Sequence, residues 1–258
     1  MSFLHDIVDA RRHAVSAAKK KRPVDTLLAE IAPAGRGRPF SEALIAPGIS
    51  LIAEMKRASP SRGPIRPDAD VAEIVRHYQD AGASACSVLT EPDFFGGSLD
   101  DLRAARAATR LPLLRKDFIV DEYQLVEARH AGADAALLIV AALEPDRLAA
   151  LLAHAQSLGL DVLVEVHEDD EVEIAVDAGA EIIGINNRNL KSLEVDTETT
   201  FELLSDIPAG TVVVAESGIT GRDEVLRLEE AGVDAILVGE ALMGSDDMPR
   251  TVRTLLGT

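Results

Sequence analysis

The chain is almost without cysteine, since Cys86 is the single one in 258 residues. One thiol excludes an internal disulfide framework and is typical of a protein kept in a reducing cytosol. Cys86 lies inside a short apolar run, so we expect it to pack in the core rather than to react. The first residues, Met1 to Asp6, lack the charged-then-apolar pattern of a signal peptide. A cytoplasmic location is therefore predicted.

Basic residues are scarce as well. The sequence has 26 Lys and Arg against 44 Asp and Glu, which gives a net charge of −18 at pH 7. A protein that binds a phosphate backbone needs a basic footprint, so no nucleic-acid partner is expected. The one basic run, Lys19 to Arg22, is interpreted as the solvated C-terminus of a helix, where cations suit the helix dipole.

Long apolar runs and clustered metal ligands are missing too. No stretch approaches the length of a bilayer-spanning helix, so no membrane partner is expected. The 6 histidines show no ligand spacing, and no metal site is predicted. The sequence indicates no other cofactor.

What the sequence does contain is an internal repeat. Near-copies of an Ala-Gly-Ala-Asp motif start at Ala81, Ala131, Ala178 and Ala231, separated by 50, 47 and 53 residues. Each copy follows an amphipathic stretch and precedes an apolar run. Glycine at this point suits the left-handed residue that ends a helix. Each interval therefore corresponds to two strand–helix units.

Strands and helices are predicted to alternate through most of the chain. Eight apolar runs read as strands, near 50–55, 84–89, 111–115, 135–140, 161–166, 181–186, 211–216 and 235–239. Helical patterns lie between and after them, near 70–81, 99–108, 121–131, 144–158, 168–178, 199–205, 221–231 and 247–256. This alternation predicts an α/β protein with parallel strands, and the regular units favour a (β/α)8 TIM barrel. The alternative is an open doubly wound sheet, but no Gly-x-Gly-x-x-Gly follows the first strand.

Residues 1–49 precede the first strand. Leu4, Ile7, Val8 and Val15 have helical spacing, and a second short helix is expected near 24–30. The segment from Pro33 to Pro39 breaks the pattern. Because 49 residues are too few for a core of their own, we expect an N-terminal helical extension packed on the barrel. Residues 1–258 are thus predicted to form a single barrel domain.

Seven ionisable or amide side chains lie where buried strands end. A buried charge is costly unless it is paired or solvated at a site, and barrel enzymes place their chemistry at the C-terminal rim of the strands. Alternation along the strands puts these side chains on shared faces. The set is Glu54, Lys56, Lys116, Glu165, Asn186, Arg188 and Glu216. We expect them to converge at one mouth, although any one alone could instead form an outward salt bridge to a helix.

Two glycines suggest an anion site beside these charges. Ser217 and Gly218 follow the seventh predicted strand, and Gly239 ends the eighth. Barrels often bind phosphate between these two loops through backbone N–H groups, and glycine permits a close approach. The loop 57–67 after the first strand is long, with three prolines and a possible hinge at Gly63. It is interpreted as a lid over the site, with an ordinary rigid surface loop as the alternative.

Several motifs, in order along the chain, resemble those of the indole-3-glycerol phosphate synthase family. They are Glu54-Met55-Lys56-Arg57-Ala58-Ser59-Pro60-Ser61-Arg62-Gly63, Leu89-Thr90-Glu91 with Phe94-Phe95-Gly96-Gly97-Ser98, Leu114-Arg115-Lys116-Asp117-Phe118, Leu163-Val164-Glu165-Val166-His167, Gly184-Ile185-Asn186-Asn187-Arg188-Asn189-Leu190 and Ala215-Glu216-Ser217-Gly218-Ile219. The similarity runs from about residue 50 to about 243, and residues 1–49 match only loosely.

The resemblance implies ring closure of 1-(2-carboxyphenylamino)-1-deoxyribulose 5-phosphate, with loss of carbon dioxide and water, to indole-3-glycerol phosphate in tryptophan biosynthesis. By this resemblance Lys116 is the general acid for ring closure, and Glu165 orients the amine and serves as acid or base. Lys56 contacts an anionic part of the substrate and donates a proton in dehydration, for which Glu54 is the base. Which lysine protonates which atom at each step stays open.

The other residues carried over by resemblance hold the substrate. Asn186 belongs with the catalytic set and, together with Arg188, positions the substrate, while Glu216 supports the charged cluster. Phe95 and Phe118 pack against the aromatic ring. The expected phosphate ligands are Ser59, Ser217, Gly218 and Gly239.

Two alternatives remain beside this interpretation. Phosphoribosylanthranilate isomerase is a related barrel, but its pattern has a catalytic cysteine at the end of the first strand, where this chain has Glu54 and Lys56. The second alternative is a barrel that binds a phosphorylated metabolite without turnover, and retention of the whole charged set argues against it. The expected partner is a small phosphorylated substrate, with other tryptophan-pathway enzymes as candidate partners.

Overall fold

Eight parallel strands close into a barrel in the computed structural model, which describes residues 3–31, 37–190 and 192–258. The strands are β1 (Ser50–Met55), β4 (Ala85–Leu89), β5 (Leu113–Lys116), β6 (Ala135–Ile139), β7 (Asp161–Val166), β8 (Ile182–Asn186), β9 (Val212–Glu216) and β10 (Ala235–Val238). Each strand pairs with its neighbours in sequence, and β10 closes the barrel on β1 with Ser50 opposite Ala235. The predicted TIM barrel is confirmed, and the open sheet is excluded.

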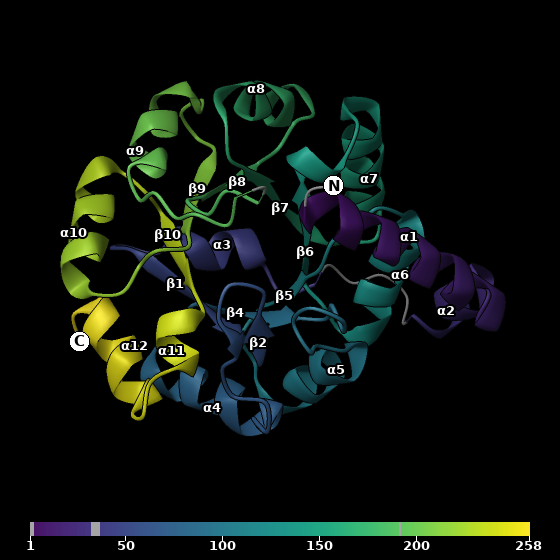
Figure 1. Ribbon diagram of the computed structural model, residues 1–258, viewed down its shortest axis with the longest axis horizontal. Helices are drawn as coiled ribbons and strands as arrows, with labels where there is room; N and C mark the ends of the chain where they lie inside the picture. The colour runs from purple at the N-terminus through teal and green to yellow at the C-terminus, as the bar shows by residue number, and fades with distance from the viewer. Residues whose placement is uncertain (1–2, 32–36, 191) are drawn as a thin grey trace.

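Helices surround the strands, as Figure 1 shows in a view down the barrel. They are α4 (Val71–Ala81), α5 (Leu99–Ala108), α6 (Glu122–Ala131), α7 (Pro145–Ser157), α8 (Asp169–Asp177), α9 (Thr199–Leu203), α10 (Arg222–Ala231) and α12 (Met248–Leu256). Gly82, Gly132 and Gly232 end α4, α6 and α10 in the left-handed conformation, with φ of 102°, 94° and 94°. The repeated glycine therefore ends helices, as its position in the motif predicted.

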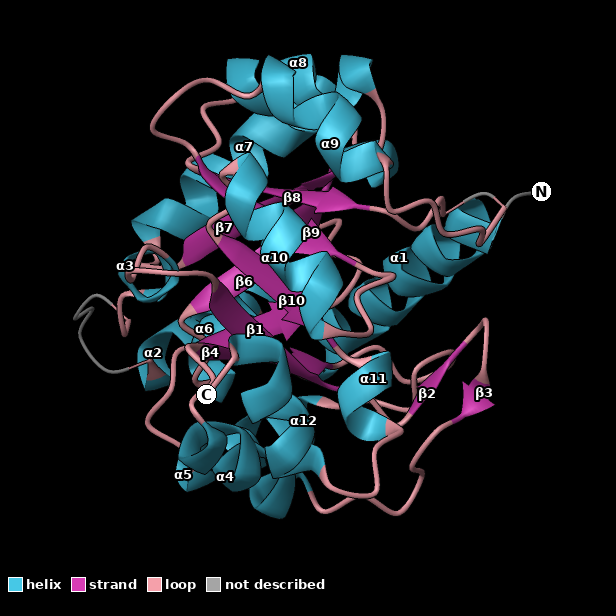
Figure 2. Cartoon of the chain, turned by 90° about the vertical axis from the view of Figure 1, so that its left-hand side faces the viewer, coloured by secondary structure: helices cyan, strands magenta, loops and turns pink. Residues whose placement is uncertain are grey.

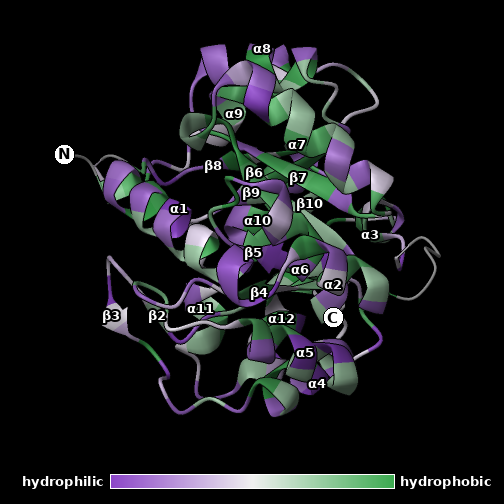
Figure 3. Ribbon diagram, turned by 90° about the vertical axis from the view of Figure 1, so that its right-hand side faces the viewer, coloured by the Kyte–Doolittle hydropathy of each residue, from purple (hydrophilic) through white to green (hydrophobic). Residues whose placement is uncertain are grey.

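The alternation of side chains along each strand divides the core into two layers. In β1, Leu51 and Ala53 pack toward the helices, whereas Ile52 belongs to the cluster inside the barrel. Leu114 and Leu163 are inner residues of β5 and β7. Cys86 is fully buried in the outer layer, as expected for a core thiol. Figure 3 shows the hydrophobic strands in the middle and helices of mixed hydropathy around them. The charged inner residues Lys116 and Glu216 are the last residues of β5 and β9, so their charges lie where these strands end.

Two helices of the N-terminal extension pack at opposite ends of the barrel. The extension contains α1 (Phe3–Lys21), α2 (Val24–Glu30) and α3 (Phe40–Leu44). Leu4, Ile7 and Val8 of α1 join the inner cluster from the end where the strands finish. Phe40 and Leu44 of α3 are fully buried and join it from the other end. Figure 2 shows α1 and α3 on opposite sides of the barrel.

The sequence correctly indicated α1 and α2, and the basic run Lys19–Lys21 lies in the last turn of α1. It did not indicate α3, the short α11 (Glu240–Met243), or the turns η1 (Val140–Ala142) and η2 (Leu204–Asp206). Part of the expected break from Pro33 to Pro39 lies outside the described residues. No helix within the described part of the chain is long and apolar enough to cross a membrane.

Candidate active site

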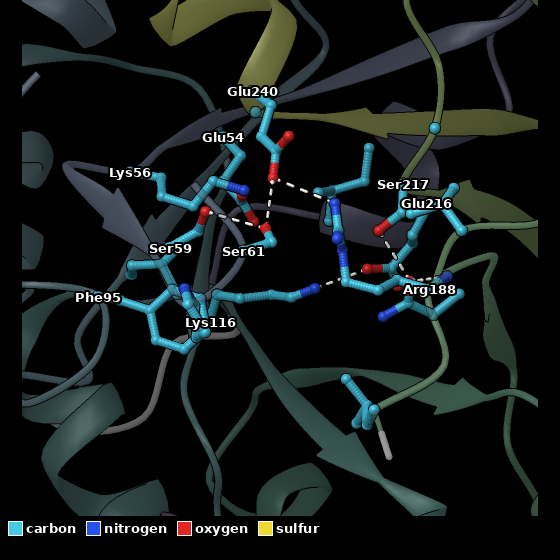
Figure 4. Close-up of a pocket in the computed structure, with 18 of the residues that line it drawn as sticks. Glu54, Lys56, Ser59, Ser61, Phe95, Lys116, Arg188, Glu216, Ser217 and Glu240 are labelled. Carbon is cyan, nitrogen blue, oxygen red and sulfur yellow. Dashed lines mark hydrogen bonds and ion pairs between the residues drawn. The ribbon is translucent and has the colours of Figure 1, made fainter. Parts of the chain in front are cut away.

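A cavity of about 340 Å³ opens where the barrel strands finish. Every residue that the sequence singled out for the site lines it, and Figure 4 labels several of them, among them Lys116 and Glu216. The full set is Glu54, Lys56, Ser59, Phe95, Lys116, Phe118, Glu165, Asn186, Arg188, Glu216, Ser217, Gly218 and Gly239. The strands end at one rim, so their last inward-facing side chains meet there. The expected convergence is observed, whereas the roles of the individual residues stay predictions.

Lys116 lies at the centre of this arrangement. Its Nζ donates to Glu216 Oε2 at 2.6 Å and to Glu165 Oε2 at 3.1 Å. Burial alone would lower the pKa of the ammonium, but the attraction of Glu216, Glu165 and Glu54 outweighs it and holds that pKa above its ordinary value. Lys116 is therefore charged before a substrate enters.

Glu165 is held through both of its carboxylate oxygens. Oε2 accepts from Lys116, and Oε1 accepts from Asn186 Nδ2 at 3.0 Å. Burial would raise the pKa of Glu165, but Lys116, His167 and Asn186 together keep it below its ordinary value. Asn186 is itself fixed, because its Oδ1 accepts from Ser217 Oγ at 2.8 Å and from the backbone of Arg188 at 3.0 Å. Glu165 is therefore an ionised, oriented carboxylate.

Glu216 has a different environment. Its Oε1 is buried and has no hydrogen-bond partner among the described residues. Burial raises the pKa of Glu216 to about 7, with further contributions from the charges of Glu165 and Glu54 against the opposing pull of Lys116. A Cβ at Gly184 would collide with Oε1, so glycine in β8 makes room for this carboxylate. Of the two carboxylates beside Lys116, Glu216 is the one that gains a proton first as the pH falls.

The ion pair of Lys56 and Glu54 forms the wall of the cavity at β1. Their Nζ and Oε1 atoms are 2.8 Å apart, and both side chains are largely buried. A Cβ at Gly239 would collide with Glu54 Oε1, so this glycine is required by a carboxylate whatever binds beside it. The sequence suggested that glycine is needed at position 239 so that the backbone can approach an anion. The structure adds a second reason, which is the space that Glu54 occupies.

Ser217 and Gly218 form a tight turn after β9. Both have positive φ, 65° and 79°, and Ser217 is one of two such non-glycine residues in the described part of the chain. Asn187 Nδ2 donates to the carbonyl oxygen of Ser217 at 3.1 Å and stabilises the turn. Strained backbone of this kind costs about 1–3 kcal/mol and is typical of binding sites.

Two aromatic rings face the cavity beside Lys116. The centroids of Phe95 and Phe118 are 6.2 Å apart, with an interplanar angle of 36°. Glu91, fully buried, accepts from the backbone N–H groups of Phe94 and Phe95 at 2.7 and 3.1 Å and so holds the turn that carries Phe95. The pair provides an apolar, aromatic surface suited to an aromatic ligand.

Glu240 also lines the cavity, and sequence reasoning missed it. Its Oε1 accepts from Arg188 Nη2 at 3.1 Å and from Ser61 Oγ at 3.4 Å, as the dashed lines in Figure 4 show. An acidic residue directly after Gly239, the expected phosphate ligand, was the available signal. Arg188 is therefore already paired with the carboxylate of Glu240 before a substrate anion binds.

Apolar lining residues were missed as well. Phe3 reaches the cavity from α1 and meets Phe94 edge-on, with ring centroids 5.2 Å apart. Leu190, Leu193 and Val195 reach it from the loop after β8. Isolated apolar residues in a helix end or a loop have no periodicity that would mark them as part of a site.

The loop after β1 carries a small hairpin. β2 (Ala58–Ser59) pairs with β3 (Gly63–Pro64), and Gly63 has a φ of 67°. Figure 2 shows the hairpin projecting on the side of the barrel where α11 lies, and its Ser59 and Ser61 line the cavity. The choice between a lid and a rigid loop stays a prediction.

The chemistry available follows from these groups. The largely buried ammonium of Lys116, beside a carboxylate with raised pKa, can protonate a carbonyl oxygen and then accept a proton in a site screened from bulk water. Arg188 and Lys56 offer positive charge to an anion, and the phenylalanines offer an apolar face. The cavity suits a ligand that is both aromatic and anionic.

Comparisons with known proteins agree with this chemistry. A family model described as indole-3-glycerol phosphate synthase matches residues 4–255. The relatives include indole-3-glycerol phosphate synthase 2 of Streptomyces coelicolor, 52% identical over 90% of this chain and 89% of the relative. The enzyme of the same family name from Chlorobium luteolum is 49% identical over 96% of this chain and 95% of its own. That of Rhodococcus opacus is 47% identical over 99% and 95%.

Solved structures that resemble the chain share its fold at low sequence identity. A mutant tryptophan synthase α-subunit from Pyrococcus furiosus has a TM-score of 0.63 and 15% identity, and covers 81% of this chain and 98% of its own. Thiamine phosphate pyrophosphorylase from the same organism has a TM-score of 0.60 and 22% identity, over 80% and 93%. At these identities the likeness concerns the barrel alone.

Proposed function

The chain belongs to the indole-3-glycerol phosphate synthase family, and we propose that the charged cluster around Lys116 carries out its reaction. The enzyme is a carboxy-lyase of tryptophan biosynthesis. It closes the ring of 1-(2-carboxyphenylamino)-1-deoxyribulose 5-phosphate, with loss of carbon dioxide and water, to give indole-3-glycerol phosphate. The observation that carries the assignment of residues is a largely buried ammonium between two buried carboxylates, next to two phenylalanine rings.

Ring closure requires a proton donor at the ketone. The aromatic carbon that carries the carboxylate attacks the ketone carbon, and Lys116 donates its proton to the ketone oxygen. The carboxylate then leaves as carbon dioxide, and its bonding electrons restore the aromatic ring. Glu165 holds the amine of the substrate, and Phe95 and Phe118 hold the ring plane. Both carboxylates beside Lys116 favour its charged form, so that the proton is in place when the carbons meet.

Dehydration requires a second acid and a base. The hydroxyl formed from the ketone leaves as water with a proton from Lys56, and Glu54 takes a proton from the adjacent ring carbon. The 2.8 Å contact between Lys56 and Glu54 places the two groups on one side of the cavity. In this proposal the two stages use different pairs of groups, Lys116 with Glu165 for ring closure and Lys56 with Glu54 for dehydration.

The remaining residues bind the anionic ends of the substrate. We propose that Arg188 and Asn186 position it, that Glu216 supports the cluster, and that the phosphate lies against the turn after β9 and the end of β10. The phosphate ligands in this proposal are Ser59, Ser217, Gly218 and Gly239. All four line the same cavity as Lys116, which supports their assignment to one substrate.

We propose that residues 1–258 act as one domain, since the inner cluster contains residues of α1 and α3 together with the strands. A cytoplasmic location is proposed from the single buried thiol. Association with other tryptophan-pathway enzymes stays a prediction, to be tested by sedimentation of the full chain mixed with each enzyme.

Turnover of the purified chain tests the proposal. With the carboxyphenylamino-deoxyribulose phosphate as substrate, we expect indole fluorescence to appear with one carbon dioxide released per product. An isomerase would consume phosphoribosylanthranilate and release no carbon dioxide. A barrel that only binds would be stabilised against heating by the substrate without turnover. Either result would overturn the proposed function.

A further inference from the structure

His167 lies two residues after Glu165, at the end of β7, and the reaction described above gives it no role. Its side chain is only 6% exposed, on the side of Glu165 that faces away from Lys116. It belongs to the Leu163–His167 motif of the sequence, yet it does not line the cavity. Its role must therefore act through a neighbour.

Two carboxylates flank the imidazole ring, one at each nitrogen. Nδ1 is 3.1 Å from Glu171 Oε2, and the same oxygen accepts from the backbone N–H of His167 at 2.7 Å. Nε2 is 3.5 Å from Glu165 Oε1, is buried, and has no hydrogen-bond partner among the described residues. The contacts with Glu171, in the first turn of α8, fix the ring and direct Nε2 at Glu165.

This arrangement determines the protonation state of the ring. A neutral imidazole carries one N–H and one lone pair, so either tautomer would direct a lone pair at a carboxylate. Only the imidazolium offers an N–H to both Glu171 and Glu165. Burial alone would lower the pKa of His167, but Glu171, Glu165 and Glu216 outweigh it and hold that pKa above its ordinary value.

The charges of the cluster favour the same conclusion. Lys116 is shared by Glu165 and Glu216, so two buried carboxylates have one ammonium between them. A buried charge without a partner is strongly destabilising. The charged groups around Glu165 come from β5, β9 and the end of β7, namely Lys116, Glu216 and His167. Of these, His167 is the group that can add a second positive charge.

We propose that His167 is a positioning residue for the reaction, an imidazolium that bridges Glu171 and Glu165 and keeps Glu165 ionised. Together with Asn186, it holds the Oε1 side of the carboxylate and leaves Oε2 directed at Lys116. When Lys116 gives its proton to the ketone, Glu165 loses one positive neighbour and keeps the other. The inference rests on the role proposed for Glu165.

Nuclear magnetic resonance of the histidine rings tests the bridge without any turnover. In the full chain, with its 6 histidines isotopically labelled, the signal missing from His167→Asn identifies His167. We expect its apparent pKa to lie above the ordinary 6.5 and to fall in Glu171→Gln. A His167 that is neutral at about pH 6, or that does not respond to Glu171→Gln, overturns the proposal. Because this measurement needs no catalysis, its outcome is separate from that of the turnover assay.

A pair of neutral variants tests the effect on catalysis. His167→Asn keeps a donor toward Glu171, and His167→Gln reaches toward Glu165 with a neutral donor. Without the imidazolium the pKa of Glu165 rises, so both variants should lose kcat/KM mainly on the acid side. Relative to wild type, we expect an additional loss of about threefold or more near pH 5.5 compared with pH 8. An equal loss at every pH would mean a structural role and would overturn the proposal.

His130 provides the matched control. It also contacts a carboxylate, with its Nε2 at 3.0 Å from Glu30 Oε2, but it lies on α6, away from the cavity lining. His130→Asn should leave the pH profile of kcat/KM unchanged. If His130→Asn lowers kcat/KM at acid pH as the His167 variants do, then the loss of any histidine charge has this effect, and the proposal fails.

Discussion

Lys116 Nζ lies 2.6 Å from Glu216 Oε2, while the other oxygen of Glu216 is buried with no hydrogen-bond partner in the described part of the chain. One oxygen of this carboxylate is thus paired with Lys116, and the other is buried without a partner among the described residues. The pKa of Glu216 is raised by burial to about 7, so its charge changes around neutral pH.

Glu216→Gln should remove a pH dependence of substrate binding. Glu216 is protonated below about pH 7 and ionised above it, so the wild-type cavity gains a negative charge as the pH rises. The ratio of wild-type to variant KM should be flat on the acid side and should increase above neutrality. Steady-state kinetics across this pH range measures the ratio of the two KM values. Because the same substrate is used with both proteins, its own titration affects both KM values equally and cancels in the ratio. A ratio independent of pH would show that Glu216 does not titrate there.

Lys116→Ala should lower kcat by at least ~10²-fold, the usual scale for loss of a general acid. Because the change also removes the ammonium between two buried carboxylates, Lys116→Arg serves as its partner. Arginine keeps the positive charge but does not release its proton, so it should be similarly inactive with the fold retained by circular dichroism. Near-normal kcat in the arginine variant would mean that charge, rather than proton donation, is the contribution of Lys116.

Glu165→Gln separates binding from turnover. Glutamine keeps the size and one of the two hydrogen bonds, because its single oxygen can accept from Asn186 or from Lys116 but its NH2 group cannot accept, and it removes the charge and the basicity. We expect a product-like anion to bind within about tenfold of wild type, while turnover falls by ~10² or more. Equilibrium titration and single-turnover kinetics give the two numbers. Equal losses in both would make Glu165 a structural partner of Lys116 alone.

The barrel and the converging charges could be predicted because both depend on local rules. Side-chain alternation within one strand placed Glu54 beside Lys56, and the shared rim of parallel strands brought Lys116 to Glu165 across 49 residues of sequence. Neither step needs a particular long-range contact. The regular Ala-Gly repeat gave the register of the helices.

The parts that could not be predicted depend on single long-range contacts. Glu240 contacts Arg188 and Ser61 only because β10, β8 and the loop after β1 end at the same rim of the barrel. In the sequence, Glu240 is visible only as an acidic residue that follows Gly239. The short α3 and α11 have too few residues for a helical period. Gly218 illustrates a further limit, since a Cβ there would also lie 2.7 Å from Thr197. A side chain at Gly218 would disturb the neighbouring loop as well as a bound anion.

Glu240→Gln should tighten the binding of anions. The Oε1 atom of Glu240 accepts from Arg188 and from Ser61, so a substrate anion must compete with it for the guanidinium. We expect inorganic phosphate to inhibit the variant at a concentration about threefold or more lower than the wild type. Asp246→Asn removes the same charge from the exposed loop after α11 and is the control. If both variants respond equally, the contact with Arg188 contributes nothing specific.

Arg11→Leu should destabilise the whole chain in one transition. Arg11 Nη2 of α1 donates to Asp117 Oδ2 at 3.0 Å, and the two side chains are 9% and 0% exposed. Asp117 keeps Arg115 at 2.9 Å, so the loss should be about 1–3 kcal/mol of unfolding free energy, the range for a buried polar group that loses a partner.

Urea denaturation followed by circular dichroism measures this loss, with Arg12→Leu as the control on the same helix. Arg12 has an exposed contact with Asp9 at 3.1 Å, and its replacement should change stability by less than about 1 kcal/mol. Arg11→Leu should also raise KM more than it lowers kcat. KM should rise because α1 carries Phe3 onto the cavity wall and Asp117, the partner of Arg11, directly follows Lys116. The value of kcat should change less because Glu216 still holds Lys116. If α1 belongs to the same domain as the barrel, helix and barrel unfold together in both variants. Two separate transitions, with the first one alone shifted by Arg11→Leu, would show that the N-terminal extension folds independently.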